Sequence, residues 1–128
     1  MVSRTHLKID PSLCGVPVEL AEGTATVTLL TTRPMGADAR GLVHGGFVFG
    51  LADYAAMLAV NDPNVVLGAA QTRFIAPVSV GQSVTAVAIR TAVKGRKHTV
   101  DVVASVGEKT VFTGSFTTFI LDGHVLDA

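Results

Sequence analysis

The sequence predicts an α+β fold in which a curved antiparallel β-sheet wraps around one long central α-helix. Only one segment of the chain has the composition of a helix, and that segment is apolar on nearly every side. Four segments after it are dominated by valine, threonine and isoleucine, which strands prefer. A single helix cannot cover both faces of a doubly wound sheet, whereas a sheet curled around it buries every apolar face.

Two strands are expected before the helix. The first is a short strand over residues 5–9, and residues 10–11 and 15–17 have the composition of turns. The second covers residues 24–29, where three threonines alternate with apolar residues, the period of two that marks a half-buried strand. Residues 33–41 hold a proline and two glycines and are expected to form a loop.

The helix is expected over residues 47–61. It is rich in alanine, a good helix former, and its apolar character on all sides predicts burial on most of them. Gly45 and Gly46 precede it, and Asn61 and Pro63 end it. Short turns at 94–97 and 107–108 predict two hairpins in the second half of the chain. The four strands expected there cover residues 65–75, 83–93, 98–106 and 110–121.

The composition predicts one domain over residues 1–128 that associates with copies of itself. Of the 128 residues, 48% are hydrophobic and 16% are charged. A small monomer needs many polar residues at its surface, so this shortage indicates a homodimer or homotetramer. The alternative is a surface covered by threonine and glycine. The charges of ten basic and ten acidic residues cancel. The protein therefore has no net positive charge that would attract nucleic acid.

We expect a soluble, cytoplasmic protein without membrane contact, metal or cofactor. No secretory signal is visible at the start of the sequence. The longest apolar stretch is about 14 residues, whereas a membrane span needs about 20. Cys14 is the only cysteine and the histidines outside the glycine motif are scattered, so no disulfide or metal site is predicted.

Gly45 and Gly46 are candidates for binding a developing negative charge. The first amides of a helix have no intrahelical partner and lie at the positive end of its dipole. Two glycines there remove the Cβ atoms that would keep a ligand away, so the amides could form an oxyanion hole for a carbonyl oxygen. The alternative is an ordinary Gly-Gly turn before a helix.

Asp53 is a candidate general base, because it lies inside an otherwise apolar helix. Burial of a carboxylate is costly and raises its pKa, which makes it a better base for water. The alternative is an aspartate on an exposed stripe of the helix or a structural hydrogen-bond acceptor. Perturbed carboxylates beside a cleft tend to be functional, which favours the first interpretation.

Asp53 and Gly45 cannot belong to the same site within one chain. Asp53 lies eight residues after Gly45, which is about 12 Å along a helix. A base must come within about 3 Å of the water that it activates. Two antiparallel helices from two subunits satisfy both requirements, so catalysis by both residues demands a dimer. His44 could position the loop or contact the substrate carbonyl, and a histidine that only caps or packs is an equal alternative, since an imidazole can do either.

These residues bring out a resemblance to a known family. His44-Gly45-Gly46 followed by Asp53 resembles the hotdog-fold acyl-CoA thioesterases of the phenylacetyl-CoA thioesterase type. Leu51-Ala52-Asp53, Arg73-Phe74-Ile75-Ala76-Pro77 and Gly81 also match, and the resemblance covers residues 23–119. It implies dimers joined edge to edge that often pair into tetramers. It also implies that Asp53 is the base or nucleophile, that the Gly45 N–H polarises the thioester carbonyl, that His44 supports this region, and that no cofactor is needed.

Two departures from the family pattern concern the mechanism. Asp38 stands six residues before His44, where the family often has an asparagine that orients water or substrate. An ionised Asp38 would repel Asp53 across the site and leave one of the two protonated. Residues 65–68 also lack the serine or threonine that some members carry there.

The remaining candidate residues bind substrate. The turn of Lys94, Arg96 and Lys97 suits phosphate groups, and in similar proteins it lies near the phosphates of CoA. The alternative is an ordinary solvated hairpin tip. The side chains expected to line the pocket, together with Gly46, are Phe47, Phe49, Tyr54 and Phe74.

The predicted reaction is therefore hydrolysis of an acyl-CoA thioester. A non-catalytic protein that binds or senses acyl-CoA is the alternative from another class. A hydratase or dehydratase on the same fold ranks lower, because Asp38 and His44 are spaced differently from the pattern of those enzymes and no proline precedes the histidine.

Overall fold

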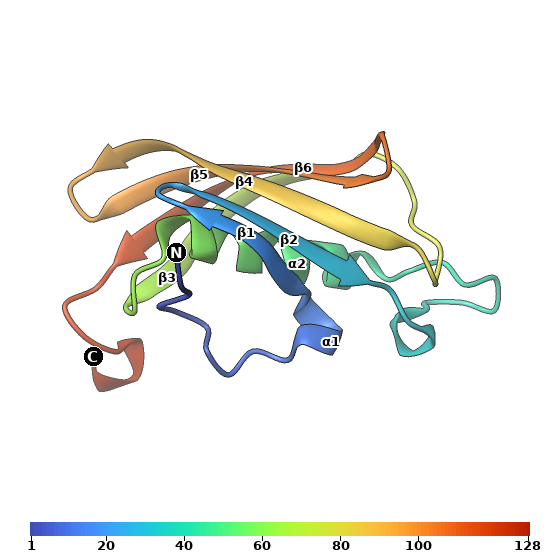
Figure 1. Ribbon diagram of the computed structural model, residues 1–128, viewed down its shortest axis with the longest axis horizontal. Coiled ribbons are helices and arrows are strands. Elements are labelled where there is room, and N and C mark those ends of the chain that lie inside the picture. The colour runs from blue at the N-terminus through green and yellow to red at the C-terminus, as the bar shows by residue number, and fades with distance from the viewer.

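The computed structural model describes residues 1–128 and contains one antiparallel six-stranded sheet curved around one long helix, α2 (Figure 1). The strands are ordered β1-β2-β4-β5-β6-β3, which leaves β1 and β3 at the edges. This confirms the predicted α+β fold. The elements are α1 (Pro11–Cys14), β1 (Val16–Ala21), β2 (Thr24–Leu30), the 3-10 turn Arg33–Met35, α2 (Gly45–Val60), β3 (Val65–Phe74), β4 (Ser83–Lys94), β5 (Lys97–Val106), β6 (Lys109–Ile120) and the 3-10 turn Val125–Asp127.

The strand predicted over residues 5–9 was wrong. His6 adopts a left-handed backbone conformation with φ 55°, which interrupts an extended chain, and its ring packs on Tyr54 at 6.0 Å between centroids. The first strand is β1 instead. It begins right after Gly15 and tolerates Pro17, because an edge strand can lack one N–H donor.

The other elements lie close to their predicted positions. α2 begins two residues earlier than expected, because Gly45 and Gly46 are already helical, and it ends at Asn61 in the left-handed conformation with φ 54°. The antiparallel pairing of β4 with β5 and of β5 with β6 confirms both predicted hairpins. None of the helices has the length and apolar character that crossing a bilayer requires.

The core lies between α2 and the concave face of the sheet. Alanines and valines of β2, β4 and β5 face the helix there, so the helix can approach the sheet closely. The segment before β1 covers the opposite side of the second half of α2 (Figure 1). Asn61 fixes this segment, since its side chain accepts from the Arg4 N–H at 2.7 Å and donates to the Val2 carbonyl at 2.9 Å.

The two halves of α2 therefore differ in exposure. Every residue from 54 to 59 is buried, whereas Val48 is the only buried residue between 45 and 50. The side of the first half that faces away from the sheet stays uncovered, and the candidate catalytic residues lie there.

Candidate active site

An open stripe runs along the first half of α2 through Gly46, Gly50 and Asp53. These residues are spaced as i, i+4 and i+7, which places them on the same face of a helix. A Cβ atom added to Gly50 would meet no atom within 4 Å, so the surface beside it is empty. Gly50 is not among the residues predicted from the sequence, although its spacing from Gly46 and Asp53 was a usable signal.

The amides at the start of α2 are free. The N–H groups of Gly45 and Gly46 donate to no backbone or side-chain acceptor, although the first turn is well formed by the bond from the Phe47 N–H to the His44 carbonyl. Such unsatisfied donors at a helix N-terminus bind developing negative charge.

His44 is the N-cap residue of α2, and its exposed ring lies over the first turn. Its side chain makes no capping hydrogen bond, but its backbone N–H donates to the Met35 carbonyl at 2.9 Å and so ties the loop to the helix start. A Cβ on Gly46 would lie 2.8 Å from the ring Nε2, so this ring position requires a glycine at 46.

Asp53 lies at the end of the stripe, where the N-terminal segment begins to cover the helix. Its Oδ1 atom is buried and has no hydrogen-bond partner. Burial raises the pKa of this carboxyl to about 6. Cys14 of α1 lies close enough to Asp53 to feel its charge. The pKa of the Cys14 thiol is raised mainly by desolvation and secondly by the negative charge of Asp53. No local pattern in the sequence indicated Cys14, which the fold brings to Asp53.

Asp38 takes a structural position in the loop before α2. Its Oδ1 accepts hydrogen bonds from the Arg40 N–H at 2.9 Å and the Leu42 N–H at 3.1 Å. Within one chain, desolvation by burial is the cause of the raised pKa of Asp53, without a contribution from Asp38. The expected repulsion between these two carboxylates is thus absent within a chain and stays a prediction for the dimer.

An apolar groove of about 320 Å³ begins beside Gly45 and runs between α2 and the segment after β3. Phe74 and Ile75 are 57% and 54% exposed at its mouth, and valines 43, 48, 78 and 111 form its walls. Phe74 packs edge-on against Phe112 at 5.2 Å between ring centroids, which holds the ring over Gly45. The sequence indicated Phe74, but the valines and Ile75 come together only in the fold.

The other aromatic candidates lie elsewhere. Phe47 is half-buried with its ring edge-on to His44, and Phe49 packs on Phe116 at 5.6 Å between centroids. Tyr54 is 5% exposed beneath the N-terminal segment and lies neither on the open stripe nor in the groove.

The basic turn between β4 and β5 lies beyond the C-terminal end of α2. Arg96 forms an ion pair with Asp122 and donates to the Ile120 carbonyl, so part of its charge is neutralised within the chain. Lys94 and Lys97 are exposed and form no ion pair. No three side chains of His, Cys, Asp or Glu come together in a way that could hold a metal ion.

Asp53 and Gly45 lie far apart within one chain. Asp53 and Gly45 lie on one continuous helix, so the carboxylate stays about 12 Å from the amide in the direction of the axis. The structure brings Gly45, Gly46, His44 and Phe74 together and leaves Asp53 at the other end of the open stripe.

Comparisons with known proteins place the chain in a family. The family model of the thioesterase superfamily matches residues 40–113. An uncharacterized protein from Pyrococcus horikoshii is 48% identical in a solved structure, with a TM-score of 0.98 over 99% of this chain and 98% of that chain. A mutant of the phenylacetic acid degradation protein PaaI from Thermus thermophilus is 30% identical, with a TM-score of 0.79 over 88% of this chain and 100% of that chain.

One curated relative is much longer. A methylthioribose-1-phosphate isomerase from Aquifex aeolicus is 52% identical over 120 residues, which are 93% of this chain but 26% of that protein. The chain thus spans about a quarter of this relative, and the isomerase name describes a protein with a large further part. The match to more than half of the chain, together with the fold of its neighbours, shows that the chain is a hotdog-fold member of the thioesterase superfamily.

Proposed function

We propose that the protein hydrolyses an acyl-CoA thioester to a free acid and CoA, at a site that two copies of the chain share. The observation that carries this proposal is the open stripe of α2. It has bare amides at one end and, at the other, a carboxylate with a buried, unpartnered oxygen. Both groups suit acyl transfer to water, and neither can reach the other within one chain.

A dimer through β3 would complete the site. β3 is an edge strand, and most of its residues are exposed, so its free N–H and C=O groups can pair with a second copy of itself. A two-fold axis at this edge sets the two α2 helices antiparallel. The middle of one helix can then face the N-terminus of the other, which puts Asp53 opposite the partner's Gly45.

The proposed chemistry uses these groups in sequence. The Gly45 N–H donates to the thioester carbonyl oxygen, and Asp53 of the other subunit takes a proton from a water that attacks the carbonyl carbon. The C–S bond of the tetrahedral intermediate then breaks, and the CoA sulfur leaves as a thiol with the proton that Asp53 took from the water. His44 holds the loop through its backbone contact with Met35, and no metal or organic cofactor takes part. Lys94 and Lys97, exposed and free of ion pairs, would contact the CoA phosphates.

The pH dependence of the reaction should report the ionisation of Asp53. A general base acts in its deprotonated form, and burial raises the pKa of Asp53 to about 6. We therefore expect kcat/KM to fall about tenfold per pH unit below this value and to level off above it. Thiol release measured from pH 4.5 to 8 checks this, and a flat profile would contradict a base with a raised pKa.

The groove beside Gly45 favours an uncharged, apolar acyl group. Its lining contains no charged side chain, so a terminal carboxylate there would lose its hydration without a partner. The name of the PaaI relative, a phenylacetic acid degradation protein, agrees with an aryl acyl group. We expect phenylacetyl-CoA or hexanoyl-CoA to be hydrolysed with at least about 100-fold higher kcat/KM than succinyl-CoA.

A thiol-release assay over this panel is the experiment that tests the proposed function. Turnover of any acyl-CoA supports an enzyme, and the ranking of the acyl groups tests the role of the groove separately. Tight binding by calorimetry without released thiol would instead favour the alternative, a protein that senses acyl-CoA. The isomerase activity of the long relative is not proposed for this chain, which matches about a quarter of that protein.

A further inference from the structure

A polar pocket lies beyond the C-terminal end of α2, whereas the candidate active site lies along the first half of this helix. The pocket has a volume of about 260 Å³. It is formed by the end of α2, the segment before β1, the turn between β1 and β2, and strands β4, β5 and β6. We call it the distal pocket. Five of its lining side chains can carry a charge: Arg4, Glu22, Asp62, Arg90 and His98.

His98 is the buried polar residue of the distal pocket. It is 9% exposed, and its ring Nδ1 is buried without a hydrogen-bond partner. The neighbouring Thr118 does not satisfy the ring, because its hydroxyl donates to the His98 backbone carbonyl at 2.9 Å. Polar groups that are buried without a partner are rare and costly in proteins. A ligand in the pocket would give the ring the hydrogen bond that it lacks.

Positive charge prevails beside the His98 ring. Arg90 pairs with Val100, two residues after His98 in β5, so Arg90 and His98 lie on the same face of the sheet. The pKa of His98 is lowered first by desolvation and then by the charge of Arg90, and the charge of Asp62 raises it by less. An anion between the guanidinium and the ring would offset the repulsion that a protonated ring meets there.

Arg4 is the second guanidinium of the distal pocket. It is exposed and forms no ion pair, since the ion pairs of the chain are Arg90–Glu22 and Arg96–Asp122. The carboxylates of the pocket are already engaged. Glu22 accepts from Arg90 at 3.2 Å, and Oδ1 of Asp62 accepts from the amide two residues further on at 2.9 Å. The Glu22 side chain is 81% exposed, and such surface ion pairs are weak, so Arg90 can turn to another anion.

We propose that the distal pocket binds a small oxyanion of the phosphate type between Arg4, Arg90 and His98. Guanidinium groups present a fork of N–H donors that matches phosphate oxygens, and the imidazole ring supplies a further donor. The bound anion would connect the segment before β1 with the sheet. The inference does not depend on the proposed hydrolysis, because none of these three residues takes part in it.

The distal pocket is separate from the groups that we assign to the substrate. Asn61, in its wall, lies eight residues after Asp53, which is about 12 Å along a helix. Lys94 and Lys97, which we assign to the CoA phosphates, form the cross-strand pair next to that of His98. Successive residues of a strand point to opposite faces of the sheet, so these lysines point away from the pocket.

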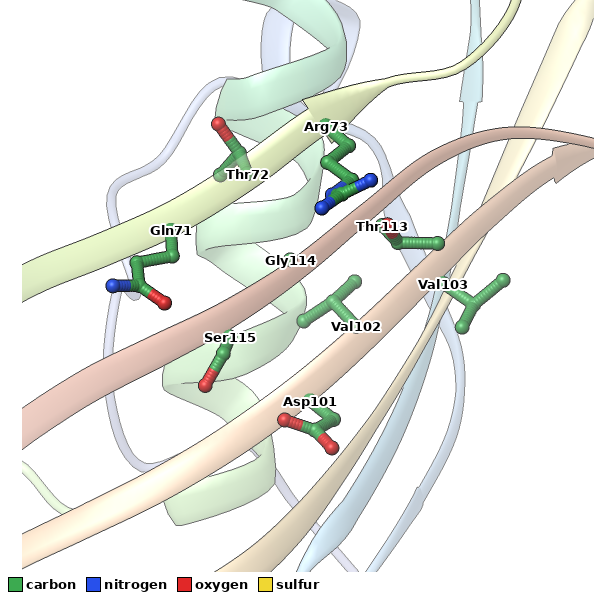
Figure 2. A pocket seen from close by; sticks show the side chains of 9 residues that line it. All are labelled: Gln71, Thr72, Arg73, Asp101, Val102, Val103, Thr113, Gly114 and Ser115. Carbon is green, nitrogen blue, oxygen red and sulfur yellow. The ribbon is translucent and has the colours of Figure 1, made fainter.

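A wider groove lies on the face of the sheet turned away from α2 (Figure 2). Its volume is about 470 Å³, and its charged side chains are Arg73 and Asp101. None of the polar side chains that line it is buried. Water can satisfy exposed polar groups, so this groove lacks the signal for a ligand that the buried His98 ring gives to the distal pocket.

NMR of the histidine side chains tests the proposal on the full chain. Histidines are labelled with ¹⁵N, and inorganic phosphate is added up to about 50 mM at an ionic strength held constant with sodium chloride, because salt alone screens exposed charges. The ring nitrogens of His98, assigned by their loss in His98→Gln, report binding in the distal pocket. Those of His44 report binding at the start of α2. A second titration with glycerol 3-phosphate distinguishes a phosphate monoester from the free ion.

Arg4→Gln is the principal variant, because Asn61 binds the backbone N–H of residue 4, which the substitution retains. We expect phosphate to bind the wild type with a Kd of about 1 mM. The Kd should rise at least about fivefold in Arg4→Gln and in Arg90→Gln. Arg40→Gln, which removes an exposed arginine outside the pocket, is the matched control and should leave the Kd unchanged.

Binding should also raise the pKa of His98, because a neighbouring anion favours the protonated ring. The pKa is measured from the ring shifts with and without phosphate. A preference for either ligand supports the site and identifies its source of phosphate. A His98 ring that responds to neither ligand, equal affinity of the wild type and Arg4→Gln, or shifts confined to His44 would overturn the proposal.

Discussion

Replacing Asp53 by alanine should lower kcat by about 10²–10⁴-fold, the usual contribution of a general base. The carboxylate that would deprotonate water is lost, while the bare amides of Gly45 and Gly46 stay in place and still bind the carbonyl. KM should therefore change much less than kcat. Thiol release under saturating acyl-CoA measures the loss, and gel filtration shows whether the variant keeps the size of the wild type.

Asp53→Asn is the matched control, since it keeps the shape of the side chain and removes only its charge. The pKa of about 6 in the folded protein lies above the ordinary aspartate value of 3.8, so ionisation of Asp53 works against folding. The contribution of the protonated Asp53 carboxyl to the free energy of unfolding is complete below the pKa that Asp53 has in the unfolded chain. It is lost as the pH rises through 6. The Asn variant should thus be at least as stable as the wild type at pH 8. Near wild-type turnover in either variant would remove Asp53 from the mechanism.

Most of the fold could be predicted because its signals are local. Threonines that alternate with apolar residues fix β2, and turns with glycine fix the hairpins around β5. The N-terminal segment is different. His6 packs on Tyr54, and Asn61 holds the backbone of residues 2 and 4, so contacts with a distant helix decide a conformation that the local sequence does not specify.

The residues of the candidate site that lie on α2 could be predicted from the sequence. Asp53 is predicted because a charged residue is rare in an apolar helix. Gly45 and Gly46 are predicted because glycines lack the Cβ atoms that would keep a ligand away from the first amides of the helix. Cys14 and the groove residue Ile75 were missed, since α1 and the segment after β3 reach the helix only through the fold. The catalytic role of Asp38 stays a prediction, and the hydrogen bonds that its Oδ1 accepts from the amides of its own loop become visible only in the structure.

Gly45→Pro should lower kcat/KM by about 10²–10³-fold, the usual effect of losing one oxyanion-hole donor. Proline has no N–H, so the substitution deletes the donor that the proposal assigns to the carbonyl oxygen. It should leave the helix intact, because Gly45 is the first helical residue, where proline is favoured. His44 already has the extended conformation, φ −63° and ψ 129°, that a residue before proline requires.

Gly45→Ala separates the loss of the donor from the added bulk. Both variants place a Cβ atom 3.1 Å from Cε2 of Phe74, and this exposed ring can move aside by a few tenths of an ångström. Alanine keeps the N–H, so its loss of kcat/KM should be less than about tenfold. Equal losses in both variants would show that bulk, and not the amide, matters at this position.

Mixing the two kinds of inactive chain tests whether the site is shared. When Asp53→Ala and Gly45→Pro chains are co-expressed, a mixed dimer has one site with both substitutions and one site with neither, because each site takes Asp53 from one chain and Gly45 from the other. Random association makes half of the dimers mixed, so about a quarter of the wild-type activity should return. If both residues acted within one chain, every site would carry one substitution and the mixture would stay as inactive as its parents.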